Sequence, residues 1–348
     1  MSEEEAMDRK VWPIPEHFQP ERMDQVWKIP YQERSVEARE FARQHEIPPA
    51  VEDAQQVELV LIDVQNTFCL PDFELFVAGR SGMGAVEDNR RLCKFIYRNL
   101  GAISGITATM DTHHSLQIFH ALFLVNQDGE HPDANTIITH QQVENGEWQV
   151  NPAAARTLGM EPDEANAYLE YYTGRLAEKD RFDLMVWPYH AMLGGIGHAL
   201  VSGVEEAVFF HSQVRQTYPD YHLKGQQIKA EAYSAVGPEI EQDDRGGTLA
   251  EKSGFLLDLV KQSRAVFFAG QAQSHCVAWT LSDLLEQILG EDPDLADKVY
   301  LLEDCSSPVV IPDVVDYTEQ AESAFQRFQD AGMNIVTSER IVPDILSE

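Results

Sequence analysis

The chain has 348 residues, 43% of them hydrophobic, which allows a sizeable core but is too short for three average domains. Its 26 basic and 58 acidic side chains give a formal net charge of −32, which disfavours nucleic acids and anionic membranes as partners. We interpret the acidic surface as a solubility feature, with adaptation to salt as the alternative. The start, MSEEEAMDRK, lacks the pattern of a signal peptide. No apolar run approaches the ~20 residues of a membrane span. The four cysteines form no CxxC pair. We therefore expect a cytoplasmic protein with free thiols.

Residues 1–54 are predicted to form an arm, because prolines interrupt this stretch repeatedly. There is room in it for one short helix near residues 35–44. The arm is too short to build a core of its own, so it must pack on the rest of the chain or on a neighbouring subunit, or stay loose. Residues 55–348 are predicted to form the main domain.

Strands and helices are predicted to alternate from Val57 onwards. The predicted strands cover residues 57–63, 106–111, 221–224, 265–269, 298–303 and 334–337. The predicted helices lie near 86–100, 163–179, 198–216, 249–262 and 317–331, with one more after Cys276. Residues 121–182 interrupt this alternation with polar sequence, and we interpret them as an insertion or lid. The pattern predicts an α/β fold, a three-layer sandwich in which helices cover both faces of a mostly parallel sheet.

Reactive side chains follow the predicted strands. Asp63, Asp111, Lys224 and Cys276 each close or follow a different strand, and ligand sites of such sheets lie at the carboxyl ends of the strands. Taken singly, an aspartate there is more often a turn or helix cap, and a buried cysteine is more often a small apolar residue. The position of Cys276 favours a catalytic thiol over a small apolar residue, because the partial positive charge of a helix N-terminus stabilises a thiolate.

A second group of residues is suited to a metal. His113 lies two residues after Asp111, and His190 follows the apolar stretch 184–186. One carboxylate and two imidazoles suit a divalent metal with open positions for water or substrate. We expect Zn²⁺, with Fe²⁺ or Mn²⁺ as alternatives. His120 is a candidate fourth ligand.

Five motifs in this order resemble those of the nicotinamidases and isochorismatase-like cysteine hydrolases. They are LIDVQNTF at 61–68, MDTH at 110–113, VWPYH at 186–190, LKG at 223–225 followed by AYSA at 232–235, and GQAQSHCV at 270–277. The resemblance covers roughly residues 57–337, apart from most of 121–182. It implies a six-stranded, mostly parallel sheet flanked by helices.

The resemblance also implies roles for particular residues. Asp63, Lys224 and Cys276 match the catalytic triad of the family, and Asp111, His113 and His190 match the metal ligands of nicotinamidases. Phe68 and Trp187 match the residues that sandwich the substrate ring, and Tyr233 matches a further aromatic residue of the pocket. The bond between Gln271 and Ala272 falls where the family has a cis peptide, and the N–H groups of Ala272 and Cys276 match the oxyanion hole.

The expected function is therefore a metal-dependent amidase that hydrolyses nicotinamide or a similar aromatic carboxamide through a cysteine thioester. A related hydrolase acting on another amide, such as an N-carbamoyl compound, is the alternative, and a non-catalytic protein that serves protein association is a third possibility. Thr67 and the segment HHSLQIFHALF depart from the family pattern, and the 77-residue gap between His113 and His190 is longer than usual for the family. The expected partners are a small-molecule amide and further copies of the chain in a homo-oligomer, with no nucleic acid and no membrane. No GxGxxG turn follows the first strand, which disfavours a dinucleotide site.

Overall fold

A computed structural model describes residues 11–179, 181–311 and 315–347 of the chain. Its main feature is a sheet of six strands in the order β12-β9-β8-β1-β2-β7. The strands are β1 (Val57–Ile62), β2 (Gly105–Asp111), β7 (Asp220–Lys224), β8 (Ala265–Gly270), β9 (Val299–Leu302) and β12 (Asn334–Val336). The pairs β1–β2, β1–β8, β8–β9 and β9–β12 are parallel. The prediction of a six-stranded, mostly parallel sheet is thus confirmed.

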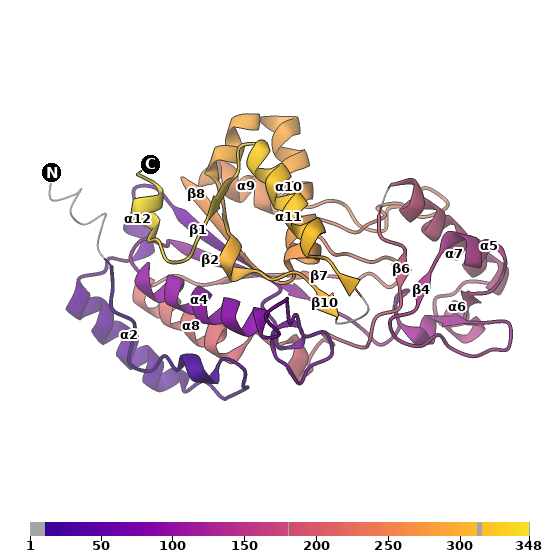
Figure 1. Cartoon of the computed structure of the whole chain (residues 1–348), viewed down its shortest axis with the longest axis horizontal. Helices are drawn as coiled ribbons and strands as arrows, with labels where there is room; N and C mark the ends of the chain where they lie inside the picture. The colour runs from indigo at the N-terminus through magenta and orange to yellow at the C-terminus, as the bar shows by residue number, and fades with distance from the viewer. Residues whose placement is uncertain (1–10, 180, 312–314, 348) are drawn as a thin grey trace. The chain divides into compact units, whose positions relative to one another are not determined.

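The central strands are apolar because helices cover both of their faces. All six residues of β1 and of β8 are buried, as expected for a parallel strand packed on both sides. Helices α4 (Gly84–Arg98) and α8 (Ser202–Arg215) cover one face, and α9 (Phe255–Gln262), α10 (Ala278–Glu291) and α11 (Thr318–Asp330) cover the other (Figure 1). This is the predicted three-layer α/β arrangement.

The predicted N-terminal arm contains helix α2 (Tyr31–His45), which packs on α8. Ala38 of α2 is completely buried, and the ring of Phe41 contacts that of Phe210 with centroids 5.6 Å apart. Arg34 of α2 also pairs with the buried Glu206 at 2.6 Å. In the described part of the arm, residues 11–54, this helix is therefore held by both apolar and charged contacts.

The chain divides into two compact units. One contains the chain up to Met110, Ala199–His222 and the chain from Gly254 onwards, and the other contains Asp111–His198 and Leu223–Ser253. The second unit has its own apolar core, centred on helix α7 (Pro162–Glu178). Its smaller elements are α5 (His140–Glu144), α6 (Pro152–Thr157) and the short antiparallel pairs β3–β5 (Leu124–Val125 with Gln149–Val150) and β4–β6 (Ile137–Ile138 with Leu184–Met185).

Two helix starts differ from their predicted positions. Helix α9 begins at Phe255, not near residue 249, because the preceding segment makes loop hydrogen bonds: Ser253 N–H donates to Val236 O at 2.7 Å. Helix α8 begins at Ser202, since residues 196–198 form a separate short 3₁₀ turn. Among the described residues, none of the helices has the length and apolar character that crossing a bilayer requires.

Candidate active site

Asp63 and Cys276 follow neighbouring strands of the first unit. Strands β1 and β8 are in register up to the pair Ile62 and Gly270, so Asp63 follows the carboxyl end of one strand and Cys276 the end of the other. Asp63 is fully buried and adopts a left-handed backbone conformation, with φ of 49°. The hydroxyl of Thr109, on β2, donates to Asp63 Oδ1 at 2.6 Å. This hydrogen bond restrains the carboxylate at the end of the strand.

Cys276 lies in a tight turn between β8 and α10. The turn, Gln273–Val277, is a single π-helical turn, and α10 begins only at Ala278. The prediction that Cys276 begins a helix is therefore correct in place, although the first turn is not α-helical. The carbonyl of Ala272 accepts hydrogen bonds from the N–H groups of His275 (3.0 Å) and Val277 (3.1 Å). The peptide bond between Gln271 and Ala272 is cis, as the family resemblance implied.

The group that holds this turn was not predicted from the sequence. The side-chain amide of Gln271 donates to Asp88 Oδ2 on α4 at 2.8 Å, and its oxygen accepts from the N–H of Ser307 at 3.2 Å. Arg91 donates to the other oxygen of Asp88 at 2.7 Å. Burial raises the pKa of Asp88, and hydrogen bonds from Ser307, Gln271 and Arg91 oppose this shift. We refer to Asp88, Gln271 and Ser307 as the turn clamp.

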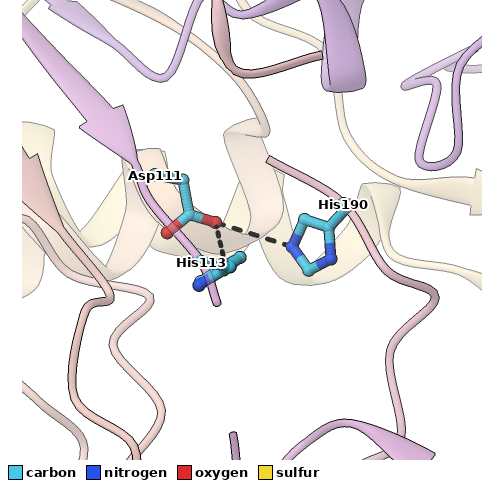
Figure 2. A group of neighbouring side chains, drawn as sticks. All are labelled: Asp111, His113 and His190. Carbon is cyan, nitrogen blue, oxygen red and sulfur yellow. Dashed lines mark hydrogen bonds and ion pairs between the residues drawn. The ribbon is translucent and has the colours of Figure 1, made fainter. Parts of the chain in front are cut away.

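Three potential metal ligands gather in the second unit (Figure 2). Asp111 ends β2, His113 follows it by two residues, and His190 comes from the loop after β6. All three side chains are buried, and one ligand atom of each lies within 4.8 Å of those of the others. Asp111 Oδ2 is 2.8 Å from His113 Nε2 and 3.6 Å from His190 Nε2. The cluster predicted from sequence therefore forms within one unit.

Backbone carbonyls orient both imidazoles. His113 Nδ1 is 3.1 Å from the carbonyl oxygen of Gly225, and His190 Nδ1 is 2.7 Å from that of Pro188. A carbonyl only accepts, so each Nδ1 carries the proton and, in the neutral ring, each Nε2 keeps a lone pair. Outer hydrogen bonds of this kind hold metal-bound histidines in the required tautomer.

This arrangement fits a divalent cation. Two Nε2 lone pairs and an Asp111 oxygen face one another, which is unfavourable unless a proton or a cation lies between them. Ligands about 2.0–2.1 Å from a tetrahedral Zn²⁺ are roughly 3.3 Å apart, close to the separations of Asp111 Oδ2 from the two rings. The donor set of one carboxylate and two imidazoles suits Zn²⁺ and Fe²⁺ equally.

Lys224 contacts this cluster, a relationship that the sequence analysis did not predict. Its Nζ lies 2.9 Å from Asp111 Oδ1 and 3.1 Å from the carbonyl of Ala232. Burial alone would raise the pKa of Asp111, but the charges of His113 and Lys224 hold it well below its usual range. Asp111 therefore stays ionised and directs one oxygen to the lysine and the other to the histidines.

The surroundings of Gly225 explain why the LKG motif has a glycine at this position. Its φ of +77° is unfavourable for other residues, and a Cβ there would lie 2.6 Å from Asp111 Oδ1 and 2.8 Å from His113 Cε1. Its carbonyl also accepts from the side chain of Gln117 at 2.6 Å. The absence of a side chain at residue 225 lets the backbone approach and orient His113.

His120 lies beside the cluster but outside the group of three. Its ring centroid is 6.1 Å from that of His113 and 6.4 Å from that of His190. The ring is fully buried, and neither nitrogen has a hydrogen-bond partner among the described residues. Burial, and then the charges of His190 and His113, lower the pKa of His120 to about 3. The ring is therefore neutral at pH 7 and keeps a nitrogen lone pair available to a ligand.

The comparisons with known proteins found solved structures only. No protein-family model matches the chain, and no curated protein does. The chain is similar in structure to nicotinamidases and pyrazinamidases. An Acinetobacter baumanii nicotinamidase is 18% identical with a TM-score of 0.46, and the match covers 83% of this chain and 99% of that one. Yeast nicotinamidase bound to nicotinaldehyde is 18% identical with a TM-score of 0.49, covering 81% and 100% of the two chains.

A third match is a Pyrococcus horikoshii pyrazinamidase in complex with zinc, 18% identical with a TM-score of 0.41, covering 81% of this chain and 99% of that one. At these identities and TM-scores, the matches do not assign a substrate or a residue role.

The predicted site residues are divided between the two units. Asp63, Phe68, Ala272 and Cys276 belong to the first, whereas Lys224, Trp187, Tyr233 and the three potential metal ligands belong to the second. Within the second unit, Trp187 Nε1 donates to the hydroxyl of Tyr233 at 3.1 Å, so these two predicted pocket residues are in contact. The pairing of Phe68 with Trp187 and of Asp63 with Lys224 stays a prediction.

Proposed function

We propose that this chain is a metal-dependent amidase that hydrolyses nicotinamide or a similar aromatic carboxamide to the acid and ammonia. The observation that carries the proposal is the orientation of His113 and His190, whose Nε2 atoms face one oxygen of Asp111. The five motifs in family order support it independently. A cation held there would bind the nitrogen of the substrate ring and orient a water molecule.

In this proposal Cys276 is the nucleophile. Its thiolate attacks the carboxamide carbon after Asp63 has taken the thiol proton. The N–H groups of Ala272 and Cys276 donate to the oxyanion, and loss of one such donor typically costs about 3 kcal/mol of transition-state stabilisation. The C–N bond then breaks, and ammonia leaves with the proton from Asp63. Water hydrolyses the thioester, releasing the acid and restoring the thiol.

Lys224 has two functions in this proposal. It neutralises part of the charge of Asp111, and it stabilises the ionised form of Asp63 until this carboxylate takes the thiol proton. The contact with Asp111 at 2.9 Å supports the first function. The family resemblance supports the second.

The experiment is an ammonia-release assay over a panel of nicotinamide, pyrazinamide, benzamide, an aliphatic amide and an N-carbamoyl amino acid. We expect nicotinamide and pyrazinamide to be hydrolysed fastest, activity to disappear with a chelator and to return with Zn²⁺ or Fe²⁺. Cys276→Ala is the matched control and should release no ammonia. Preferential hydrolysis of the N-carbamoyl compound would replace the proposed substrate, and full activity after metal removal would remove the metal from the proposal.

A further inference from the structure

A buried hydrogen-bonded relay connects Trp187 to an acid that the proposed chemistry does not use. The indole N–H of Trp187 donates to the hydroxyl of Tyr233 at 3.1 Å, and this hydroxyl donates to Glu231 Oε1 at 3.2 Å. Glu231 is only 3% exposed. All three residues belong to the second unit. Burying a carboxyl group costs folding free energy unless its oxygens are hydrogen-bonded. Glu231 therefore depends on the hydroxyl of Tyr233 as a hydrogen-bond partner.

The relay has one direction. An indole N–H only donates, and a phenol hydroxyl has a single proton. The oxygen of Tyr233 accepts from Trp187 with a lone pair, and the single proton of this hydroxyl is donated to Glu231 Oε1. An acceptor at residue 231 therefore determines the rotation of the hydroxyl, and the hydroxyl in turn determines the direction of the indole N–H.

Glu231 is itself held by neighbouring elements. Tyr172 of α7 donates to Glu231 Oε2 at 3.4 Å, and the hydroxyl oxygen of Tyr172 accepts from the backbone N–H of Glu231 at 2.8 Å. Glu239 accepts from the N–H of Tyr233 at 3.3 Å and forms an ion pair with Arg181 at 3.1 Å. Burial, and then the charge of Glu239, raise the pKa of Glu231 to about 8. The end of the relay is thus anchored to a helix and to an ion pair.

We infer that Glu231 is a positioning residue that sets the orientation of Trp187 and Tyr233, and thereby selects planar aromatic carboxamides over aliphatic ones. The inference rests on the proposed function, in which the two aromatic side chains line the pocket for the substrate ring. A fixed aromatic surface contacts the ring equally in the ground state and the transition state. Loss of this orientation should therefore raise KM and leave kcat nearly unchanged.

The experiment compares Glu231→Met, which cannot accept these bonds, with Glu231→Gln, which keeps an acceptor oxygen of the same shape. The first measurement is the Nε1–H signal of Trp187 in ¹⁵N-labelled protein, assigned with Trp187→Phe. We expect Glu231→Met to move this signal and Glu231→Gln to leave it near its wild-type position. In the ammonia assay we expect Glu231→Met to raise KM for aromatic carboxamides about tenfold, with kcat within threefold, while Glu231→Gln stays close to wild type.

The NMR measurement separates this inference from the proposed function. If the wild-type protein hydrolyses no carboxamide but Glu231→Met still moves the Trp187 signal, the amidase proposal fails and the relay stands. If the signal does not move, or if kcat falls with KM unchanged, the positioning role of Glu231 is wrong. Should Glu231→Met not fold, Tyr233→Phe removes the central hydroxyl and must produce the same change in the Trp187 signal.

Discussion

Lys224 Nζ lies 2.9 Å from Asp111 Oδ1, and both side chains are less than one-tenth exposed. The opposite oxygen of Asp111 faces His113 at 2.8 Å. One carboxylate therefore joins a lysine that the family resemblance assigns to the thiol chemistry and a histidine that it assigns to the metal. We expect the charge of Lys224 to affect metal binding at Asp111 and His113, and the charge of a bound metal to affect Lys224.

The first prediction concerns Lys224→Met. This change leaves the buried carboxylate of Asp111 without its lysine partner, which typically costs about 3–5 kcal/mol. A divalent cation would supply the missing charge, so the loss should be large with a chelator and much smaller with added Zn²⁺. Thermal unfolding under both conditions measures this difference. Lys229→Met is the control because Lys229 lies 4.0 Å from Asp243 in a partly exposed pair. Equal stability of Lys224→Met and wild type in chelator would contradict the prediction.

The second prediction concerns His120. Its buried nitrogens lack partners among the described residues, and its ring is next to those of His113 and His190. We expect His120→Leu to weaken Zn²⁺ binding about tenfold, as the loss of a group that assists a metal site does. Asp111→Asn should abolish tight binding. Competition with a chromogenic chelator measures both affinities. Wild-type affinity in His120→Leu would contradict the prediction and leave His120 with a packing role only, against the ring of Tyr189, whose centroid lies 4.6 Å away.

The third prediction concerns thiol reactivity. Cys69, Cys93 and Cys305 are at most 1% exposed, and burial raises the pKa of all three, that of Cys69 to about 12. Cys276 is 7% exposed, so it should be the thiol that iodoacetamide modifies first at pH 7. Peptide mass spectrometry identifies the modified residue. Cys276→Ser should remain largely unlabelled, and early labelling of Cys69 would place the reactive thiol elsewhere.

The fourth prediction concerns the turn clamp. Gln271→Ala removes the contacts with Asp88 and Ser307, leaving polar groups without these partners at a cost of about 1–3 kcal/mol. If the N–H of Ala272 serves the oxyanion, its displacement should lower kcat and leave KM unchanged. Steady-state kinetics with nicotinamide test this, and Gln273→Ala is the control in the same turn. A rise in KM alone would assign the clamp to substrate binding.

The fifth prediction concerns the pH dependence of stability. Burial lowers the pKa of His211 to about 4, and its Nε2 lies 2.9 Å from the carbonyl of Ile103. Because the folded pKa lies below the unfolded value of about 6.5, the unfolded state binds the proton first. His211 should therefore reduce stability as the pH falls from about 6.5 to 4, by about 2 kcal/mol at pH 5.

Urea unfolding at pH 7 and pH 5 measures this loss. We expect His211→Gln to show a smaller loss of stability between the two pH values than wild type does. His131→Gln changes an exposed histidine and should match wild type. An identical pH dependence in wild type and His211→Gln would show that this ring does not contribute.

The order of strands and helices was predictable because it depends on local patterns. Apolar runs such as Val57–Ile62 identify buried parallel strands, and the residue that follows each run was placed correctly at a strand end. The group of three potential metal ligands was predictable because each of them belongs to a motif that resembles those of the nicotinamidases.

The contacts that orient these residues were not predictable from sequence. The carbonyl of Gly225 contacts His113 across 112 residues of sequence, and Gln271 contacts Asp88 across 183 residues. Such contacts depend on how elements pack, which a local pattern does not record. Gly225 carried a signal, since a glycine in a motif indicates close approach of a backbone, but Gln117 and Asp88 carried none.

All three potential metal ligands, together with Lys224 and the carbonyls that orient the two imidazoles, belong to the second unit. Asp63 and Cys276 belong to the first. A change of ion preference would therefore require substitutions in one set of chain segments, whereas the proposed nucleophile lies in the other set.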